Sequence, residues 1–421
     1  MNAKYHNSEK GQAIVFLVLG LVVFLGFVAL ALDGGMALAD RRHSQNSADA
    51  ASLAGGGEAS LYLENQHMYY SNWNCSAGAV IGAMNLAEVT AVNRAAANNF
   101  SIDTNMADHN GTLATCGTFD YGFYVDKYID VTVDISATTK SNFAQIIFPN
   151  ALHNEVDAVT RIRPRQPLVL GNAIVALNPA ACSGQQNGAG FHGNGDVGVI
   201  GGGIFSNGCL RNDGNTDVIV DDGGVYGQDI RDGDAFDPDA EYSDYQIPPS
   251  NYNVPLPDCS DPDAHNLSGD ELLDPDITPQ PLEPGLYCIS GDLEMHSNDE
   301  LHGFGVTIFL ATGGIHVNGT ADIQLSAPVR SPDPAPAIPG ILIYLPSNNH
   351  SAIILNGNEG AFFNGTILAP GSSIQLTGTS QNTYQGQVVG WNVEVGGNSD
   401  TFVTFNPDDG YTIPTSIELY K

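Results

Sequence analysis

The sequence predicts a chain of mixed class, with an α+β part behind an N-terminal transmembrane helix and an all-β part after it. Three observations lead to this prediction. Residues 13–32 contain no charged side chain. Residues 67–180 combine a helical repeat of apolar positions with alternating, strand-like segments. Beyond residue 180, short apolar stretches are separated by Gly, Asn, Asp and Ser, a pattern typical of β-rich folds.

The composition favours an exported protein and excludes one class of partner. The 421 residues include 14 Lys and Arg against 47 Asp and Glu, so the net charge is −33. Nucleic-acid binding requires clustered Lys and Arg, and nucleic acid is therefore excluded as a partner. No two of the six Cys have C-x-x-C spacing, which argues against zinc ribbons and thioredoxin-like sites. Scattered Cys in an acidic chain favour disulfides formed in an oxidising compartment.

Residues 13–32 are the first predicted element. A helix of this length spans about 30 Å, enough to cross the hydrocarbon core of a bilayer. A cleaved signal peptide is the alternative, because Ala37-Leu38-Ala39 resembles a cleavage site, but signal peptides have apolar runs of only about 7–15 residues. We therefore expect a single-pass protein of the cell membrane, with residues 1–12 as a cytoplasmic tail and the bulk of the chain extracellular.

Residues 33–66 are predicted to continue the span as a helical stem. They are rich in Ala and other helix formers up to Gly55-Gly56-Gly57, where a stop is expected. The order KGQA, an apolar span ending in Asp33 and Gly34, an Arg-Arg pair and then QNSADAASLAGG resembles the N-terminal region of the TadG-like proteins of Tad (Flp) pilus systems. The resemblance covers residues 8–56 and extends more loosely to about residue 180.

Residues 67–180 are predicted to form a small α+β domain. Apolar side chains recur at a helical period in residues 76–99, at Val80, Ile81, Met84, Ala87, Ala91 and Ala95. Three strands are expected after this helix, at 118–125, 128–136 and 154–163, with a short helix between the last two. One helix packed on a small sheet is the simplest arrangement of these elements.

Residues 181–421 are predicted to form a β-solenoid. The pattern that starts at Asn364-Gly365 returns 21 residues later at Gln385-Gly386, and short strands at that interval suit stacked rungs. A β-sandwich with hairpins is the alternative architecture. The acidic, Pro-rich residues 237–284 are interpreted as an insertion lying over the solenoid surface. The last hundred residues loosely resemble β-helical bacterial surface adhesin domains.

The six Cys are expected to form three disulfides, and six Cys allow fifteen pairings. We predict that they pair in sequence order, since Cys75 and Cys116 bracket the predicted helix at 76–99. The expected pairs are Cys75 with Cys116, Cys182 with Cys209, and Cys259 with Cys288.

Calcium is the one cofactor that the sequence suggests, because Asp-rich loops supply the hard oxygen ligands it prefers. Solvated acidic loops are the competing interpretation, since the loops lack the Gly and terminal Glu of an EF-hand. The candidate ligands are Asp232, Asp234, Asp237 and Asp239, with Asp261, Asp263, Asp270 and Asp274 as a second set.

No catalytic residue is predicted, and the protein is not expected to be an enzyme. Asn215-Thr216-Asp217 and Asp221-Asp222 resemble the carboxylate motifs of β-helical pectinases. Along one strand, however, Asp217 and Asp221 stand about 13 Å apart, beyond the roughly 6.5–9.5 Å of an inverting pair. The motifs G-x-S-x-G, H-E-x-x-H and the P-loop are absent from the sequence.

The family resemblance implies a structural component of a Tad-type pilus assembly system, acting in pilus assembly, anchoring or tip adhesion. The implied partners are other Tad pilus-assembly or pilin-like membrane proteins and the lipid bilayer, contacted through residues 13–32. A surface glycan or protein is a further candidate ligand. The alternative is a surface polysaccharide-binding or polysaccharide-cleaving β-helix protein that shares the same anchor.

Overall fold

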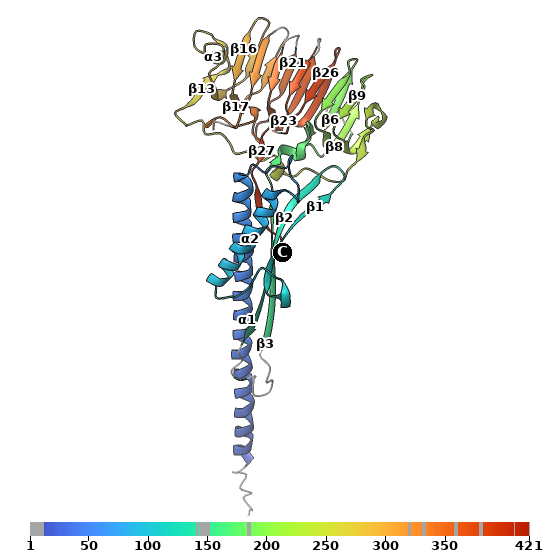
Figure 1. Ribbon diagram of the computed structural model, residues 1–421. Helices are drawn as coiled ribbons and strands as arrows, with labels where there is room; N and C mark the ends of the chain where they lie inside the picture. Colours follow the sequence, from blue (N-terminus) through green and yellow to red (C-terminus); the bar gives the residue numbers. More distant parts are fainter. Residues whose placement is uncertain are drawn as a thin grey trace, which may run out of the picture. The chain divides into compact units, whose positions relative to one another are not determined.

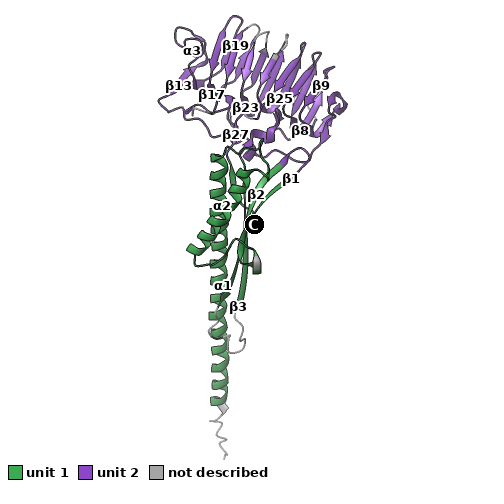
Figure 2. Cartoon of the chain, viewed as in Figure 1, with its two compact units in different colours: residues 1–119, 126–164, 415–421 green, residues 120–125, 165–414 purple. Residues whose placement is uncertain are grey.

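The chain forms two compact units in the computed structural model (Figure 2). The structure describes residues 12–139, 143, 152–182, 187–318, 321–330, 334–357, 361–378, 382–407 and 409–420. Unit 1 comprises residues 1–119, 126–164 and 415–421, and unit 2 comprises residues 120–125 and 165–414. The large insert of unit 2 therefore interrupts unit 1, and it begins at Arg165 and not at the expected residue 181.

Unit 1 packs two helices on an antiparallel sheet. Helix α1 (Gln12–Asn65) and helix α2 (Gly78–Ala97) contact each other, and α1 also packs on the sheet. The sheet has the order β1 (Gly111–Asp120), β2 (Val125–Thr139), β3 (Leu152–Arg163) and β28 (Ser416–Leu419). Every second residue of β2 from Ile129 to Ile135 is buried, and these side chains join the apolar clusters shared with the helices.

The predicted helix at 76–99 is confirmed as α2, which buries Val80, Ala87, Ala91 and Ala95. Ile81 is 42% exposed, so that predicted core position is wrong. The strand expected at 118–125 ends earlier, at Asp120, because Gly122 adopts a φ of 88° in the turn that leads to β2. The short helix expected before β3 falls in residues 140–142 and 144–151, which lie outside the described residues.

Unit 2 is built from short strands that pair in parallel. The main path of its larger sheet is β12 (Glu241–Tyr242), β10 (Val225–Arg231), β8 (Ile204–Asn212), β5 (Ile174–Ala176), β25 (Val388–Gly397), β23 (Thr366–Gly378), β20 (Ile341–Tyr344), β17 (Val306–Thr312), β14 (Gly285–Ser290) and β13 (Ala264–Ser268). The same sheet also contains β6 (Ala189–Gly193), β15 (Leu293–Met295), β18 (Ile315–Val317) and β21 (Ile353–Gly357).

A second sheet runs beside the first through the same stretches of chain. Its order is β11 (Phe236–Asp237), β9 (Val218–Asp221), β7 (Val197–Ile200), β26 (Thr401–Thr404), β24 (Asn382–Gln385), β22 (Phe362–Asn364), β19 (Asp322–Ser326) and β16 (Glu300–Phe304). One large apolar cluster joins inward side chains of both sheets, such as Ile174, Leu210 and Val403. The shorter elements of the unit are α3 (Gly269–Leu273), β4 (Gln166–Pro167), β27 (Thr412–Ile413) and 3₁₀ turns at Leu168–Gly171, Gly233–Ala235 and Pro249–Asn251.

The predicted repeat lies on neighbouring strands in register. Asn364 pairs with Gln385, and Ile374 pairs with Val393. The same interval recurs elsewhere, since Val197 pairs with Val218 at a separation of 21 residues. Parallel neighbours with this spacing place equivalent residues of successive strands side by side on one face.

The chain enters unit 2 at the middle of its strand order and not at an end. It steps outward from β5 through β8 and β10 to β12, crosses to β13, and steps back through β14, β17, β20 and β23 to β25. Strand β25 then pairs with β5, and Thr401 of β26 pairs with Val197 of β7 (Figure 1, where the red strands lie beside the green ones). Close by, β27 pairs antiparallel with β4.

A second apolar cluster covers the outer side of the larger sheet. Val175, Phe205 and Leu368 contribute from the strands, while Ile247 and Val254 contribute from the Pro-rich segment that crosses between β12 and β13. The Tyr344 hydroxyl donates a hydrogen bond of 2.8 Å to the Val254 carbonyl. This part of the acidic segment therefore seals one face of the strand stack.

Candidate functional site

The first part of α1 presents large apolar side chains that nothing in the described chain covers. From Ile14 to Leu32 its large apolar residues are 39–69% exposed. A Cβ atom added at Gly20 or Gly26 would meet no atom within 4 Å. The helix is long and apolar enough to cross a membrane. A continuous apolar surface of this size requires a nonpolar surrounding, which a bilayer supplies.

The second part of α1 presents small side chains and is packed. Its buried residues recur at a helical period: Ser44, Ser47, Ala48, Ala51, Ser52, Gly55, Gly56, Ala59, Ser60 and Leu63. A Cβ atom at Gly55 would lie 2.7 Å from the carbonyl oxygen of Ala87 in α2, and one at Gly56 would lie 2.7 Å from Thr160 Cγ2 in β3. The helix runs through Gly55-Gly56-Gly57 without the predicted stop, because Gly55 and Gly56 let α2 and β3 approach its backbone.

Polar contacts fix the packed part of α1. The Thr160 hydroxyl donates a buried hydrogen bond of 2.9 Å to Ser52 Oγ. Gln45 Nε2 donates to the Asp157 carbonyl at 3.0 Å. Asp33, the first residue after the apolar segment, is only 3% exposed, and its Oδ2 accepts a hydrogen bond from the Phe143 backbone N–H at 2.9 Å. A carboxylate held by the protein therefore ends the apolar segment, and the regularly buried positions of the helix begin at Ser44.

The last strand of the chain is tied to unit 1 by two arginines of β3. Arg161 donates two hydrogen bonds of 2.8 Å to Asp130, and its guanidinium carbon lies 3.7 Å from the Tyr128 ring centroid and 4.0 Å from that of Tyr420. The hydrogen bonds to Asp130 raise the pKa of Arg161. Sequence reasoning missed this cluster, although the alternation of Arg161 and Arg163 on one strand was its signal.

Arg163 makes the second tie. Its guanidinium donates to Asp126 at 2.8 and 3.0 Å and to Glu418 of β28 at 3.1 Å. Burial opposes the charge on Arg163, but the hydrogen bond to Asp126 and the negative charges of Asp126 and Glu418 together outweigh it and raise the pKa of Arg163. Residues 415–421 thereby belong to unit 1 and not to the predicted β-rich domain.

The three predicted disulfides are present. Cys75 is bonded to Cys116, Cys182 to Cys209, and Cys259 to Cys288. The first lies in unit 1, and the other two lie in unit 2.

The calcium candidates lie on the surface around β11. Asp232, Asp234, Asp237 and Asp239 are all exposed, and Asp232 has a φ of 57° before a short 3₁₀ turn. In the described part of the chain, no three His, Cys, Asp or Glu side chains gather in a way that would hold a metal ion. Calcium binding at these residues stays a prediction.

The pectinase-like carboxylates lie along a single strand. Asp217 directly precedes β9, Asp221 ends it, and Asp222 follows with a φ of 60°. All three side chains are exposed. They stand at opposite ends of one strand, so the structure does not bring them together as a catalytic pair.

Comparison with known proteins identifies the N-terminal region. Residues 11–58 match the model of the Tad family, which is described as "putative Flp pilus-assembly TadE/G-like". This segment is TadE/G-like. It contains the whole exposed apolar part of α1 and most of its packed part. No curated protein and no solved structure matches the chain.

The match at residues 11–58 supports a component of a Tad pilus system and implies association with other pilus-assembly components. It suggests a structural protein and not an enzyme. Together with the long apolar helix, it is consistent with a membrane anchor.

Proposed function

We propose that this protein is a membrane-anchored, exported structural component of a Tad-type pilus assembly system, acting in pilus assembly, anchoring or tip adhesion. The main observation behind the proposal is that the TadE/G-like segment, residues 11–58, covers most of helix α1, which has an exposed apolar part and a packed part. Residues 14–32 offer an apolar surface to lipid, and residues 44–63 hold a folded body. Such a helix fixes everything after it to the membrane.

Export of both units is the second element of the proposal. All six Cys follow the apolar segment, at positions 75 to 288, and all six are in disulfides, which persist in oxidising compartments. The basic residues are balanced, with Lys4 and Lys10 before the segment and Arg41 and Arg42 after it, so they set no orientation. We place residues 1–12 in the cytoplasm, residues 13–32 in the bilayer, and the remainder of both units outside the membrane.

We also propose that unit 2 is a β-solenoid and not a β-sandwich. Sandwiches are built from antiparallel strands joined by hairpins, whereas the pairings in the two large sheets are parallel. The 21-residue interval between paired residues also supports stacked rungs. The domain order is then a tail, a membrane span, a helical stem, a small α+β domain and a solenoid, which presents its faces to a surface or partner.

The proposal implies two kinds of partner. Lipid and other Tad membrane proteins meet the chain along residues 14–32, where Gly20 and Gly26 leave the helix backbone accessible to another helix. Unit 2 meets the adhesion ligand. The strongly negative charge of the chain argues against nucleic acid in either place.

A cell fractionation experiment tests the proposal. The chain is tagged after Lys421, the cells are sheared, and the tag is compared between released pili and washed membranes. Tag in the pili identifies a fibre or tip component, and tag in the membranes with fewer pili in a deletion strain identifies an anchoring or assembly component. Tag in the membranes with an unchanged yield of pili in the deletion strain contradicts a role in the Tad system.

A second candidate function is a surface polysaccharide-binding protein that shares the same anchor. The observation that favours it is a polar pocket at the ends of β22, β24 and β26, which is developed below. The polysaccharide-cleaving version depends on Asp222 and its neighbours. Unchanged glycan turnover after Asp222→Ala would contradict that version.

A further inference from the structure

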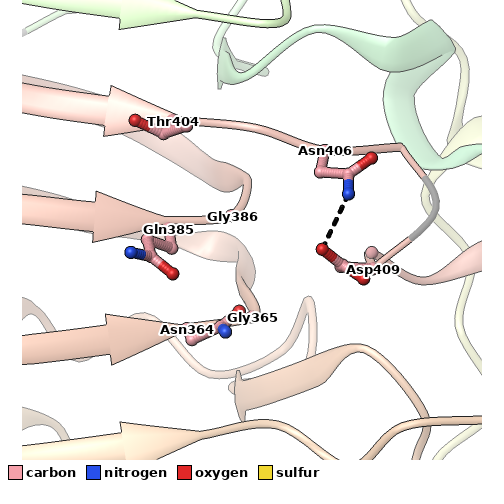
Figure 3. Close-up of a pocket in the computed structure, with 8 residues that line it drawn as sticks. Asn364, Gly365, Gln385, Gly386, Thr404, Asn406 and Asp409 are labelled. Atoms are coloured by element: carbon pink, nitrogen blue, oxygen red, sulfur yellow. Dashed lines mark hydrogen bonds between the residues drawn. The ribbon is translucent and has the colours of Figure 1, made fainter.

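Three neighbouring strands of unit 2 end at a polar pocket of about 240 Å³. Asn364, Gln385 and Thr404 are the last residues of β22, β24 and β26, and they stand opposite one another in register. Asn406 and Asp409 line the other side of the pocket (Figure 3). The three strand ends thus present a polar row that crosses the strands.

Glycines allow the backbone to pack closely at this corner of the structure. Gly365 and Gly386 follow the first two strands with φ values of 132° and 148°. A Cβ atom at Gly386 would lie 2.1 Å from the Gly365 carbonyl oxygen, and one at Gly365 would lie 2.4 Å from Ala327 Cβ. No larger residue fits at these two positions, so both glycines are required for the close packing of the strand ends beside the polar row.

The lining groups suit a ligand with many hydroxyl groups. The amides of Asn364 and Gln385 both donate and accept hydrogen bonds, as does the Thr404 hydroxyl. Asn406 Nδ2 donates to Asp409 Oδ2 at 2.8 Å, which orients that carboxylate, and Gln385, Asn406 and Asp409 are exposed. Among the described residues that line the pocket there is no Lys, Arg or His.

An unsatisfied acceptor lies behind the pocket. Gln387 is fully buried, and its Nε2 donates to the carbonyls of Leu168 and Asn172. Its Oε1 has no hydrogen-bond partner in the described part of the chain. A Cβ atom at Gly410, a residue of the pocket wall, would lie 3.8 Å from this oxygen.

The charge of the surrounding chain excludes anionic ligands. Residues 166–421 contain 4 Lys and Arg against 32 Asp and Glu, and 4 minus 32 gives −28. A surface of this charge repels polyanions. The ligand that fits both the charge and the lining groups is neutral and rich in hydroxyl groups.

A second row, made of two phenylalanines with a threonine between them and called the aromatic row below, lies beside the polar row on the same face. Phe362, Thr383 and Phe402 precede the polar row by two residues on each strand, and they also pair in register. All three are half-buried, while the residues between the two rows, Phe363, Tyr384 and Val403, are at most 3% exposed. Phe402 extends over Gly198, where a Cβ atom would lie 2.6 Å from Phe402 Cδ1. Aromatic surface beside a few polar groups is typical of binding sites. Phe362 and Phe402 lie two strands apart, which corresponds to about 9.6 Å at the usual strand spacing.

We propose that the pocket and the aromatic row together bind a neutral polysaccharide that runs across β22, β24 and β26. The aromatic rings contact the apolar faces of the sugars, and the amides and Asp409 bind their hydroxyl groups. The inference rests on the proposed adhesive role, to which it adds a ligand class and a site.

Calorimetric titration of the full chain tests the proposal, in a detergent without a sugar head group. The probes are cellohexaose, maltohexaose and N,N′-acetylated chitohexaose, which are neutral, and hexagalacturonate, which is anionic. We expect at least one neutral probe to bind and hexagalacturonate to give no heat. Gln385→Ala and Asp409→Ala should each weaken binding at least tenfold, because each removes an exposed hydrogen-bonding group from the pocket.

Gln375→Ala is the matched control. Gln375 is half-buried on β23 in the other sheet, away from the pocket lining, and its replacement should leave the Kd unchanged. Equal melting temperatures for the three variants show that folding is intact. The proposal is overturned if no neutral probe binds, if hexagalacturonate binds most tightly, or if Gln375→Ala weakens binding as much as Gln385→Ala. Because the titration uses purified protein, its failure leaves the fractionation result on Tad function unaffected.

Discussion

The two parts of helix α1 differ in the size of their side chains, and that difference assigns each part its surroundings. Residues 14–32 carry Leu, Val, Phe and Ile, which are exposed. Residues 44–63 bury mainly Ala, Ser and Gly against α2 and β3. Both parts belong to one unbroken helix, so helical periodicity alone does not distinguish them. Large exposed apolar side chains are consistent with a lipid surrounding, whereas small ones let other backbone approach.

The Gly triplet illustrates how packing overrides local preference. Each Gly in a helix costs about 1 kcal/mol relative to Ala, so three in succession weaken an isolated helix. At Gly55 and Gly56 the close contacts with Ala87 and Thr160 offset that cost. At Gly57 a Cβ atom would meet nothing within 4 Å, and no such offset exists.

The largest expected effect is the loss of membrane retention when a charge is placed in the exposed part of α1, residues 14–32. Val23→Asp should release the chain from membranes, because a carboxylate at the centre of a membrane helix costs about 3 kcal/mol. The measurement is the share of the chain that sediments with membranes after alkaline carbonate extraction. Leu53→Asp, at a site 40% exposed on the packed part, is the control and should remain in the membranes. Full retention of Val23→Asp would show that residues 14–32 do not lie in lipid.

The next largest effect is on the free energy of unfolding, and its sign differs between Gly55 and Gly57. Gly55→Ala should lower the free energy of unfolding by about 2 kcal/mol, because its Cβ meets the Ala87 carbonyl oxygen at 2.7 Å. Gly57→Ala should raise it by about 1 kcal/mol through helix propensity alone. Denaturant titration of the detergent-solubilised chain measures both. If both substitutions stabilise the protein, α1 does not pack against α2 as described.

The smallest expected effect is on the free energy of unfolding, when the hydrogen bond between Ser52 and Thr160 is removed from the packed part of α1. Ser52→Ala should lower the free energy of unfolding by about 1 kcal/mol, because the buried Thr160 hydroxyl loses its acceptor. Adding Thr160→Val should recover part of the loss, since no polar group is then left unpaired. The same denaturant titration measures the single and double variants. Additive losses would mean that the two hydroxyls do not interact.

Local patterns in the sequence were sufficient to predict the elements but not their connections. The period of Val80, Ala87, Ala91 and Ala95 predicts α2, and the repeat at Asn364 and Gln385 predicts two paired strands. Val197 pairs with Thr401, which lies 204 positions further along the chain. Nothing in the sequence of either stretch indicates that the two strands are neighbours. The entry of the chain at the middle of the strand order is therefore not predictable from the sequence.

The candidate sites also differ in whether the sequence alone could predict them. The TadE/G-like segment and the disulfide pairs can be predicted, because their residues are close in sequence or follow a known order. The pocket cannot, because Thr404 and Asp409 join Asn364 and Gln385 only after β26 has paired with β24. The binding of β28 to Arg163 through Glu418 is equally remote, at 255 residues.

The return of the chain to unit 1 has a mechanical consequence. Arg163 pairs with Ser416 within unit 1, and Gln166 pairs with Ile413 within unit 2. The chain crosses between the units at four places, and two of these crossings, residues 163–166 and 413–416, connect positions that are paired in each unit. A pull between the units is therefore shared among several covalent connections, and these two reach the strand stack through β4 and β27 and not through a terminal strand. Neither end of the stack carries these two connections, so traction through them does not peel the strands off one by one from an edge.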